Sequence, residues 1–477
     1  MSANVVGMAL LLLGLVLVVA KLIRLRSRWC QRLFLPSSII GGFLALLLGP
    51  ELLGRAASGL GYDGWAEGGI FGADILSVWS TLPGLLISIV FATLFLGERI
   101  PNPKDAAKLV GPQLSFGVAI GAGQYVIGLL LAILLLAPLF DIDPMAGALI
   151  EISFEGGHGT AAGMRDTMAD NGFPEGADLA LGLATVGVVS GVLIGVAMIN
   201  WAVRRGHTQF LKGDAQASVE EQRGLYLKDD QHPAATMTVR PSSVEPLAIH
   251  FGIVAVAVLI GYLMLTALRG IEELLWLDSV ELFAHVPLFP MAMLGGVVVQ
   301  LYIDRADHTG LVDRLMMLRI QGFALDLLII SALATLSIQA IADHLGPFLL
   351  LAGAGIAWNV AALVFLARRI IPTYWFERGI GDFGQSMGVT ATGLILMRVA
   401  DPEGKSPAFE AFGYKQLLFE PFFGGGLITA AAIPLIAQFG PEPFLLGMAA
   451  LMTFALATGL LYFGRQGPAA TSDTQLR

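Results

Sequence analysis

The sequence predicts an all-α polytopic membrane protein: two inverted-topology repeats of five transmembrane helices, each with one re-entrant loop, plus an extra C-terminal helix. Three observations lead to this fold. The 477 residues are 56% hydrophobic and only 14% charged, with a mean hydropathy of +0.75, whereas soluble domains carry about 25% charged residues. Two glycine-rich polar stretches interrupt the apolar sequence, one in each half. Basic residues are distributed unevenly between the predicted loops.

Eleven apolar stretches are long enough to cross roughly 30 Å of hydrocarbon as helices. They lie at about 4–20, 36–54, 77–96, 112–138, 178–202, 246–268, 286–303, 320–341, 347–367, 418–438 and 443–463. The predicted domains are a first repeat (1–203), a cytoplasmic linker (204–245), a second repeat (246–440) and a C-terminal part (441–477). The last part contains the extra helix, which has no counterpart in the first half, and the C-terminal tail.

The distribution of basic residues predicts the orientation of the chain. The first apolar stretch has no basic segment before it and five basic residues between positions 21 and 32, which is typical of a retained helix rather than a signal peptide. With the N-terminus outside, 25 of the 28 Lys and Arg residues fall in inside loops; the exceptions are Arg55, Arg165 and Arg269. By the positive-inside rule, we expect a multi-pass protein of the inner (plasma) membrane, with the linker and the C-terminus cytoplasmic.

The two halves show signs of a duplication. Five spans before the linker are an odd number, so the second half starts inside and a pseudo-two-fold axis in the membrane plane relates the repeats. Four short matches recur in the same order; for example, Thr160-Ala-Ala-Gly163 recurs as Thr390-Ala-Thr-Gly393. The alternative is that small residues recur because they let membrane helices pack closely.

The glycine-rich stretches, at about 146–164 and 379–397, are apolar enough to enter the membrane but too broken to cross it as helices, so we interpret them as re-entrant loops. Such interruptions at matching places in two repeats indicate a transporter's binding site. Amides at a half-helix N-terminus suit a carboxylate, whereas backbone carbonyls at a C-terminal end suit Na⁺. Alternatively, the two loops serve packing alone. The candidate substrate-binding residues are Ser153, Gly156, Gly157, His158, Gly159, Thr160, Gln385, Ser386, Gly388, Thr390 and Thr392.

Ionisable residues at membrane depth are costly and indicate function. Glu155, directly before the first glycine run, is a candidate for binding a coupling cation or proton; alternatively, it lies at the loop mouth and pairs with Arg165. Asp326 and Asn359 are further ion-coupling candidates within predicted spans. Hydrogen bonding between helices is the alternative role for Asn359, as it is for Gln124.

Enzyme motifs do not stand out in this chain. Glu155 and His158 have the spacing of two metal ligands on one helical turn, but the glycines between them disfavour a helix. We find no H-E-x-x-H motif, no recognisable Ser/His/Asp arrangement and no Walker-type GxxxxGK[ST] loop. We therefore expect neither enzyme activity nor a cofactor, no nucleic-acid binding, and transport driven by an ion gradient.

The two loops carry a resemblance to a known family. Gly156-Gly-His-Gly-Thr160 resembles the first pore-loop motif of the bacterial sodium/glutamate symporters (glutamate:Na⁺ symporters, ESS type). Gly388-Val-Thr390-Ala-Thr392 resembles that family's glycine-x-threonine-x-threonine stretch, and the resemblance covers roughly residues 1–440. It implies Na⁺-coupled symport of glutamate or a related anionic amino acid, an elevator-like alternating-access mechanism, and a homodimer in the lipid bilayer.

The chain departs from the family's pattern where Glu151 and Glu155 stand in place of neutral residues. A carboxylate beside the site keeps a proton-coupled dicarboxylate carrier open as an alternative. An ion channel also uses re-entrant loops, and a membrane receptor would bind a ligand without flux. Arg165 and Arg398 lie at loop exits, where each is either an additional cationic contact for the substrate or a charge at the membrane interface.

Overall fold

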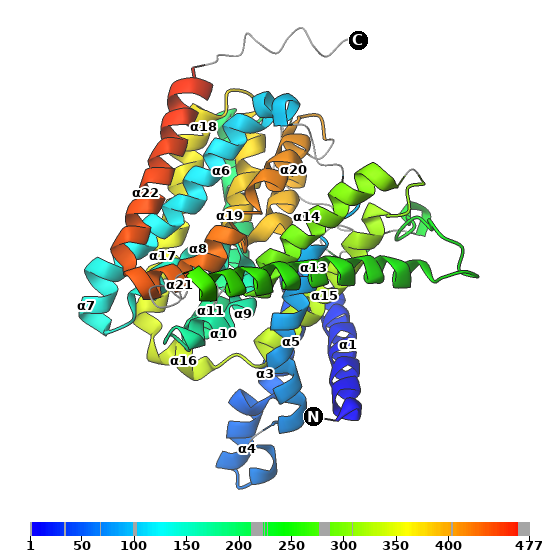
Figure 1. The fold of residues 1–477 in the computed structure, drawn as a ribbon. Coiled ribbons are helices and arrows are strands. Elements are labelled where there is room, and N and C mark those ends of the chain that lie inside the picture. Colours follow the sequence, from blue (N-terminus) through cyan, green and yellow to red (C-terminus); the bar gives the residue numbers. More distant parts are fainter. Residues whose placement is uncertain are drawn as a thin grey trace. The chain divides into compact units, whose positions relative to one another are not determined.

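The computed structural model describes residues 2–32, 35–66, 68–98, 103–210, 223, 225–226, 228–275, 287–307, 309–401 and 404–465. The regular elements in these ranges are all helices (Figure 1). The chain divides into two compact units, and each takes helices from both halves of the sequence. Unit 1 comprises Met1–Ile100, His158–Asp170 and Ser218–Asp343; unit 2 comprises Pro101–Gly157, Asn171–Ala217 and His344–Arg477. The units cut across the predicted repeats, 1–203 and 246–440, which remain predictions.

Unit 1 is built mainly from six long helices, three from each half of the sequence. Its helices are α1 (Ala3–Arg26), α2 (Arg28–Arg32), α3 (Ser37–Leu48), η1 (Pro50–Gly54), α4 (Arg55–Gly59), η2 (Asp63–Trp65), α5 (Ala73–Ala92), α10 (Arg165–Asp170), η5 (Lys228–Asp230), α13 (Pro246–Leu275), α14 (Leu288–Ala306), α15 (Arg314–Ala334) and α16 (Ile338–Asp343). The helix α9 (Gly157–Gly163) starts one residue before this unit's second segment.

Small residues let the helices of unit 1 approach closely, as in other membrane helix bundles. The helices α13 and α14 pack together, and a Cβ added at Gly261 or Gly295 would collide with the backbone of the opposite helix. The helix α15 packs on α3 and α5. An apolar cluster fills the interior of this unit where α5, α13, α14 and α15 meet, and it includes Ala92, Val254, Ala257, Ala292 and Met317.

Unit 2 contains the rest of the helices. They are α6 (Pro103–Leu131), η3 (Ala132–Leu136), α7 (Ala137–Phe140), η4 (Pro144–Ala148), α8 (Leu149–Phe154), α11 (Gly176–Arg205), α17 (Leu345–Ala361), η6 (Ala362–Ala367), α18 (Arg368–Ile370), α19 (Trp375–Ala400), α20 (Ala408–Phe419), α21 (Leu427–Phe439), α22 (Pro441–Ala457) and η7 (Thr458–Phe463). The helix α6 packs against α22, α20 and α17, while α11 packs against α19 and α8.

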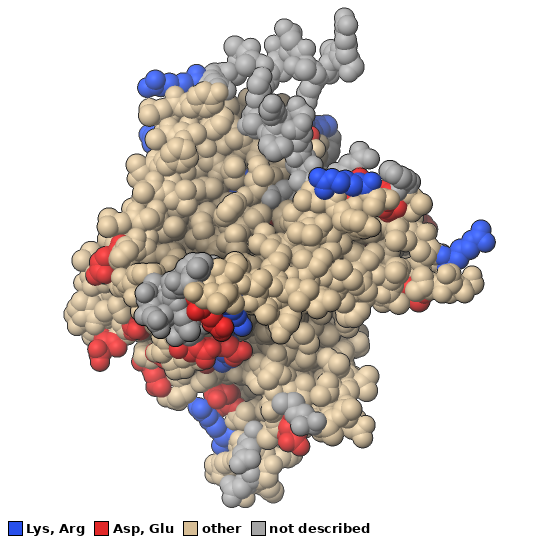
Figure 2. All heavy atoms as spheres, viewed as in Figure 1, with Lys and Arg blue, Asp and Glu red and all other residues tan. Residues whose placement is uncertain are grey.

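Ten helices in the described parts of the chain are long and apolar enough to cross a membrane. They match ten of the eleven predicted spans, including the extra C-terminal one, which forms the helical run Pro441–Phe463. The chain is therefore a polytopic membrane protein. The space-filling view agrees, because residues other than Lys, Arg, Asp and Glu make up most of the surface in view (Figure 2).

The predicted continuous span at 418–438 is wrong. The helix α20 ends at Phe419, α21 begins at Leu427, and a glycine-rich turn separates them. Gly424 and Gly425 have φ of 66° and 108°, a backbone conformation that glycine adopts without a Cβ clash. Three consecutive glycines after Pro421 indicate such a turn in the sequence. The prediction of a continuous span gave more weight to the apolar residues around them.

Neither predicted loop is among the ten spanning helices. The first, 146–164, consists of η4, α8 and α9, with a break between Phe154 and Gly157. The second, 379–397, lies within α19, whose helical backbone is interrupted at Gly388 and Val389. Each loop thus contains helical segments joined at a break, and its re-entrant path in a membrane remains a prediction.

Candidate functional site

The first break lies at the end of α8. Glu155 caps the C-terminus of this helix, and the amides of Glu155 and Gly156 both donate to the carbonyl of Glu151. Gly157 then adopts a left-handed conformation with φ of 68°. A Cβ added at Gly157 would collide with Cγ1 of Val389. Glycine is therefore required here both by the backbone conformation and by the close approach of the second broken helix.

The second break contains a strained residue. Val389 has φ of 62° and ψ of 172° inside α19, and a β-branched residue at positive φ is a genuine outlier. Such backbone costs of order 1–3 kcal/mol and clusters at ligand sites and switch regions. Thr392 stabilises the break in part, because its hydroxyl donates to the carbonyl of Gly388.

The two breaks touch each other inside unit 2. The Ser386 hydroxyl donates to Oε1 of Glu155 over 2.6 Å. The Ser386 carbonyl accepts from the side-chain amides of Gln124 (2.7 Å) and Asn359 (2.8 Å), and these two amides also bond each other over 3.1 Å. All four side chains are buried. Residues from α6, α8, α17 and α19 thus form one hydrogen-bonded network around the breaks.

A glycine stripe on α11 holds the second broken helix in place. Gly187 and Gly191 face Met387, and Gly195 faces Leu396; a Cβ at any of these three positions would collide with α19. These glycines recur every four residues and so share one face of α11. Their lack of side chains brings the backbone at the break directly against α11.

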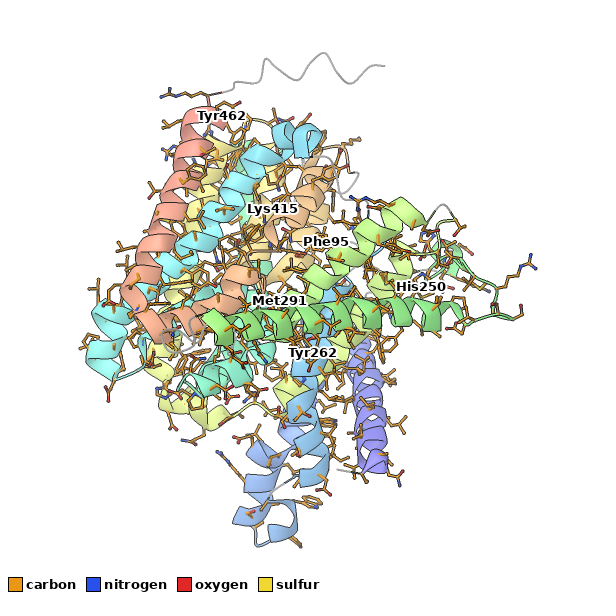
Figure 3. The ribbon with its side chains drawn as sticks, viewed as in Figure 1. Phe95, His250, Tyr262, Met291, Lys415 and Tyr462 are labelled. Atoms are coloured by element: carbon orange, nitrogen blue, oxygen red, sulfur yellow. The ribbon has the colours of Figure 1, made fainter. Side chains whose placement is uncertain are left out.

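A buried lysine forms the second part of this polar centre. Lys415 on α20 lies in the interior of unit 2 (Figure 3) and is fully buried. Its Nζ is 3.3 Å from Oδ1 of the equally buried Asp382, donates to the side-chain oxygens of Gln385 and Gln416, and lies 3.8 Å from the ring centre of Phe419. The ion pair and the cation–π contact offset the cost of burying this charge.

Thr390, directly after the break, continues the network towards the glycine-rich turn. Its hydroxyl donates to Oε1 of Glu420 over 2.9 Å. Nε2 of Gln416 donates to the Thr390 hydroxyl over 2.7 Å and to the same Glu420 oxygen over 2.8 Å. Gln416 also accepts from Lys415. The hydroxyl at Thr390 is therefore linked to the buried cation through a single side chain.

Glu151, one turn before Glu155, is fully buried and has three donors. The Tyr125 hydroxyl donates to Oε2, while the Gly424 amide and the Thr429 hydroxyl donate to Oε1, each over 2.8 Å. The broken helix at 418–438 supplies two of these three donors. A buried carboxylate needs such charge-assisted bonds, which gives a physical reason for the glycine-rich turn.

The structure brings together many of the residues singled out in the sequence. Unit 2 contains most of them. The first break and the turn before it contain Ser153, Glu155, Gly156 and Gly157, and the second break and its surroundings contain Gln385, Ser386, Gly388, Thr390 and Thr392. The side chain of Asn359 donates to the Ser386 carbonyl. His158, Gly159, Thr160 and Asp326 belong to unit 1. His158 and Thr160 are buried there, and Asp326 is half-buried on α15.

Sequence reasoning missed the buried charges of the second half. Lys415, Arg378 and Asp382 are buried, although the charge count treated the two basic residues as loop residues inside the cell. Arg398, suggested as a substrate contact, is exposed. Asp382 and Lys415 lie 33 positions apart in the sequence, so no local pattern indicated that they pair.

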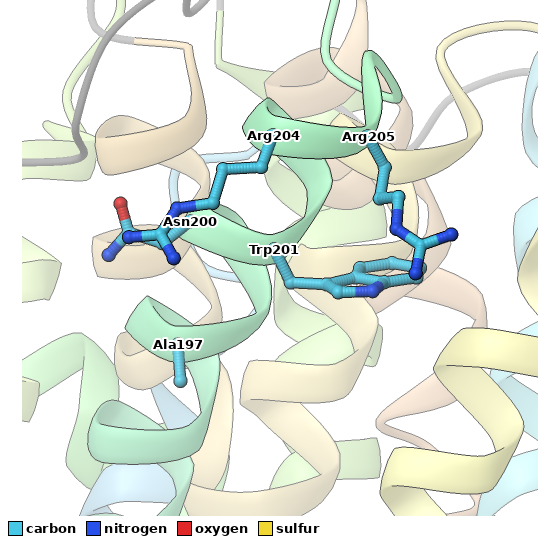
Figure 4. Close-up of a pocket in the computed structure, with 5 residues that line it drawn as sticks. All are labelled: Ala197, Asn200, Trp201, Arg204 and Arg205. Atoms are coloured by element: carbon cyan, nitrogen blue, oxygen red, sulfur yellow. The ribbon is translucent and has the colours of Figure 1, made fainter.

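A separate open pocket of about 390 Å³ lies at the end of α11, lined by Ala197, Asn200, Trp201, Arg204 and Arg205 (Figure 4). It contains none of the predicted site residues. Nearby, His207 lies between the rings of Trp201 and Trp375, with centroid distances of 5.1 Å and 5.3 Å. Burial, and then the charges of Arg368 and Arg205, lower the pKa of His207 below its usual value.

These features define a class: a polytopic membrane protein in which two interrupted helices meet at a buried polar centre, an architecture that secondary transporters use for binding. The model of the sodium/glutamate symporter family matches residues 68–398. Because this match covers well over half of the chain, the protein belongs to the sodium/glutamate symporter family, and the resemblance noted in the sequence is confirmed.

Similar individual proteins agree over a shorter stretch. The sodium/glutamate symporters of Escherichia coli (strain K12) and of Shigella flexneri are each 32% identical to this chain over 125 residues. The matched stretch is 26% of this chain and 30% of each relative. The chain thus spans less than a third of the length of these relatives in the match.

Proposed function

We propose that this protein is a secondary active transporter that couples the symport of glutamate, or a related anionic amino acid, to Na⁺. The family supports this proposal. So does the observation that carries it: the two breaks meet in unit 2, with the bond from Ser386 to Glu155 and the contact of Gly157 with Val389. Helix breaks free backbone amides and carbonyls, and these groups suit an anionic substrate and its coupling cation.

Lys415 gives the site its affinity for an anion. Its fully buried ammonium group donates a hydrogen bond to Gln385, which lies three residues before the second break. Through Gln416 it is also linked to Thr390, directly after the break. We propose that a substrate carboxylate binds among Gln385, Ser386, Gly388, Thr390 and Thr392. His158, Gly159 and Thr160 remain predictions from the family motif.

We propose an elevator-like alternating-access mechanism. Two compact units, each drawn from both halves of the chain, are the kind of division that such motion requires, because one unit can carry the site as a body. Re-entrant paths for 146–164 and 379–397 belong to the same proposal and are supported by their breaks. We further propose a homodimer in the inner membrane, with the N-terminus outside and no resident cofactor.

Uptake of radiolabelled glutamate into proteoliposomes tests the proposal. We expect saturable uptake with an inward Na⁺ gradient and none with choline in place of Na⁺. Thr390→Val should weaken uptake, because it removes the hydroxyl between Gln416 and Glu420. The substitution Thr453→Val, on the exposed side of α22, is the matched control and should leave uptake unchanged. Uptake that is linear in substrate concentration would indicate a channel, and ligand binding without flux would indicate a receptor.

A proton-coupled dicarboxylate carrier is the second candidate. Glu155 favours it, because Oε2 of this buried carboxylate has no hydrogen-bond partner among the described residues. Uptake of a dicarboxylate driven by a proton gradient in Na⁺-free buffer would select this function. Uptake that ignores the proton gradient and follows Na⁺ would exclude it.

A further inference from the structure

Glu155 is a carboxyl group placed where the backbone is already negative. The helical run Pro144–Phe154 ends at this residue, and a helix C-terminus carries partial negative charge from carbonyls without intrahelical partners. Only 3% of Glu155 is exposed, so water does not screen the repulsion. The Ser386 hydroxyl donates to Oε1, but Oε2 has no hydrogen-bond partner in the described part of the chain. This oxygen therefore needs a positive ligand.

Both oxygens of Asp382 also have no hydrogen-bond partner among the described residues, but this carboxyl group has Lys415 as an ion-pair partner. Two more buried oxygens of the same region have neither: Oγ of Ser153 and Oε1 of Gln124. Both residues have no exposed surface. Gln124 donates to the Ser386 carbonyl, while the Ser386 hydroxyl donates to Glu155, so Gln124 and Glu155 contact the same residue. Unsatisfied buried polar atoms are rare and call for a physical cause. Here all of them are oxygens, which hard cations prefer.

The charges that face Glu155 do not provide the missing ligand. They are Glu151 on the same helix, Asp382 on α19 and Lys415 on α20, with the Tyr125 phenol on α6. Lys415 directs its donors to Asp382, Gln385 and Gln416 instead. Two of these three neighbours are carboxyl groups, so the surroundings of Glu155 favour a further positive charge.

We propose that Glu155 is the charged ligand of a Na⁺ site at the meeting point of the two helix breaks, with the free oxygens of Ser153 and Gln124 in the same site. This inference rests on the proposed Na⁺-coupled function. It takes up the sequence-based expectation that Glu155 binds a coupling cation or a proton, and adds Ser153 and Gln124 as further ligands. A proton on Oε2 would satisfy one oxygen only, whereas a Na⁺ ion takes several oxygen ligands and accounts for all three unpaired atoms.

Na⁺-dependent thermal stabilisation of the purified protein, without glutamate, tests the site. NaCl is titrated against choline chloride at constant ionic strength and fixed pH, since a ligand that binds only the folded state raises its stability by mass action. We expect Glu155→Gln to raise the half-saturating Na⁺ concentration about 10–100-fold, as loss of metal-site groups does. Glu155→Asp keeps the charge and should bind Na⁺ more weakly than wild type but better than the amide. Glu273→Gln changes an exposed carboxylate on α13 and should match wild type.

Ser153→Ala provides a second arm that does not depend on the fold tolerating Glu155→Gln. Its hydroxyl forms no hydrogen bond with a described residue, so its loss should leave the melting temperature in choline unchanged while the half-saturating Na⁺ concentration rises. Wild-type Na⁺ dependence in both Ser153→Ala and Glu155→Asp would overturn the proposal, as would absence of Na⁺ stabilisation in wild type. When the titration is repeated at a second pH, loss of only the pH dependence of the melting temperature in Glu155→Gln, with wild-type Na⁺ dependence, would indicate a proton site and overturn the proposal.

The two proposals can fail separately. No glutamate is present in the stability titration, so a failed glutamate uptake assay leaves a positive Na⁺ result intact. Na⁺-driven uptake with an unchanged Na⁺ requirement in Glu155→Asp and Ser153→Ala would remove the Glu155 site and keep the transport function.

Discussion

Replacing Lys415 with methionine tests whether the buried charges around the second break depend on one another. Methionine keeps the length of the side chain, so the change mainly removes the ammonium group and leaves little new cavity. Asp382 then loses its partner at 3.3 Å while both positions stay buried, with 0–1% of each side chain exposed. Removing one partner of a buried ion pair typically destabilises the fold by about 3–5 kcal/mol.

The structure places the expected effect towards the lower end of this range. Arg378, four residues before Asp382 on α19, is buried and attracts the same carboxylate. Gln385 and Gln416 each lose one donor, and this loss of about 1 kcal/mol per hydrogen bond partly offsets the compensation by Arg378. We therefore expect a loss of about 3–4 kcal/mol in the free energy of unfolding.

A double-mutant cycle separates the ion pair from simple packing damage. Lys415→Met, Asp382→Leu and the double variant are compared with wild type by reversible denaturant unfolding in mixed micelles, and Lys228→Met, at an exposed position, is the control. A buried pair replaced by apolar residues is often close to neutral, so the double variant should be at least about 2 kcal/mol more stable than the sum of the single losses predicts. Additive losses, or a loss below about 1 kcal/mol in Lys415→Met, would refute the reasoning.

Three further substitutions probe the breaks and the end of α11. Tyr125→Phe removes a donor to the buried Glu151 carboxylate and should cost about 1.5–3 kcal/mol, measured by the same unfolding assay; an effect no larger than that of an exposed substitution would contradict it. Gly157→Ala places a Cβ against Val389 at a φ of 68° and should cost about 1–3 kcal/mol, whereas Gly252→Ala, with open space around it on α13, should be neutral or slightly stabilising. Arg368→Gln should raise the pKa of His207, as measured by NMR titration. Burial lowers this pKa most, and the positive charge of Arg368 lowers it further. The folded state then binds the proton more readily, so less stability is lost as the pH falls below the usual histidine pKa of about 6.5; an unchanged pKa would show that the Arg368 charge does not contribute.

Most of the fold could be predicted because membrane spans leave a strong local signal. In a chain this hydrophobic, a run of about 20 apolar residues almost always forms a spanning helix, and ten of the eleven predicted spans are present as helices. The one error, at 418–438, came where local chemistry conflicts with hydropathy. The turn at Gly424 and Gly425 lets a backbone amide reach Glu151, and no hydropathy average shows that a distant carboxylate needs that donor.

The candidate site was predicted in part, for a similar reason. Broken backbone is visible in the sequence, since Gly156 to Gly159 and Gly384 to Gly393 stand out against apolar surroundings. The partners of a buried charge are not visible, because Lys415 and Asp382 meet only after α19 and α20 have packed. A single lysine in a sequence looks the same whether its side chain faces solvent or the interior.

The balance of buried charges around the two breaks relates the proposed Na⁺ site to the proposed substrate site. Among the described residues, this region buries four carboxyl groups, Glu151, Glu155, Glu377 and Asp382, but only two basic side chains, Arg378 and Lys415, so it carries an excess of negative charge when the carboxyl groups are ionised. In a low-dielectric interior, an uncompensated negative charge is costly, and an anionic substrate arriving in the same region would add to it. A Na⁺ ion bound at Glu155 first would reduce that excess and leave Lys415 to attract the substrate. The excess negative charge that favours the cation would therefore make cation and anion binding depend on each other, and such mutual dependence is the thermodynamic basis of symport.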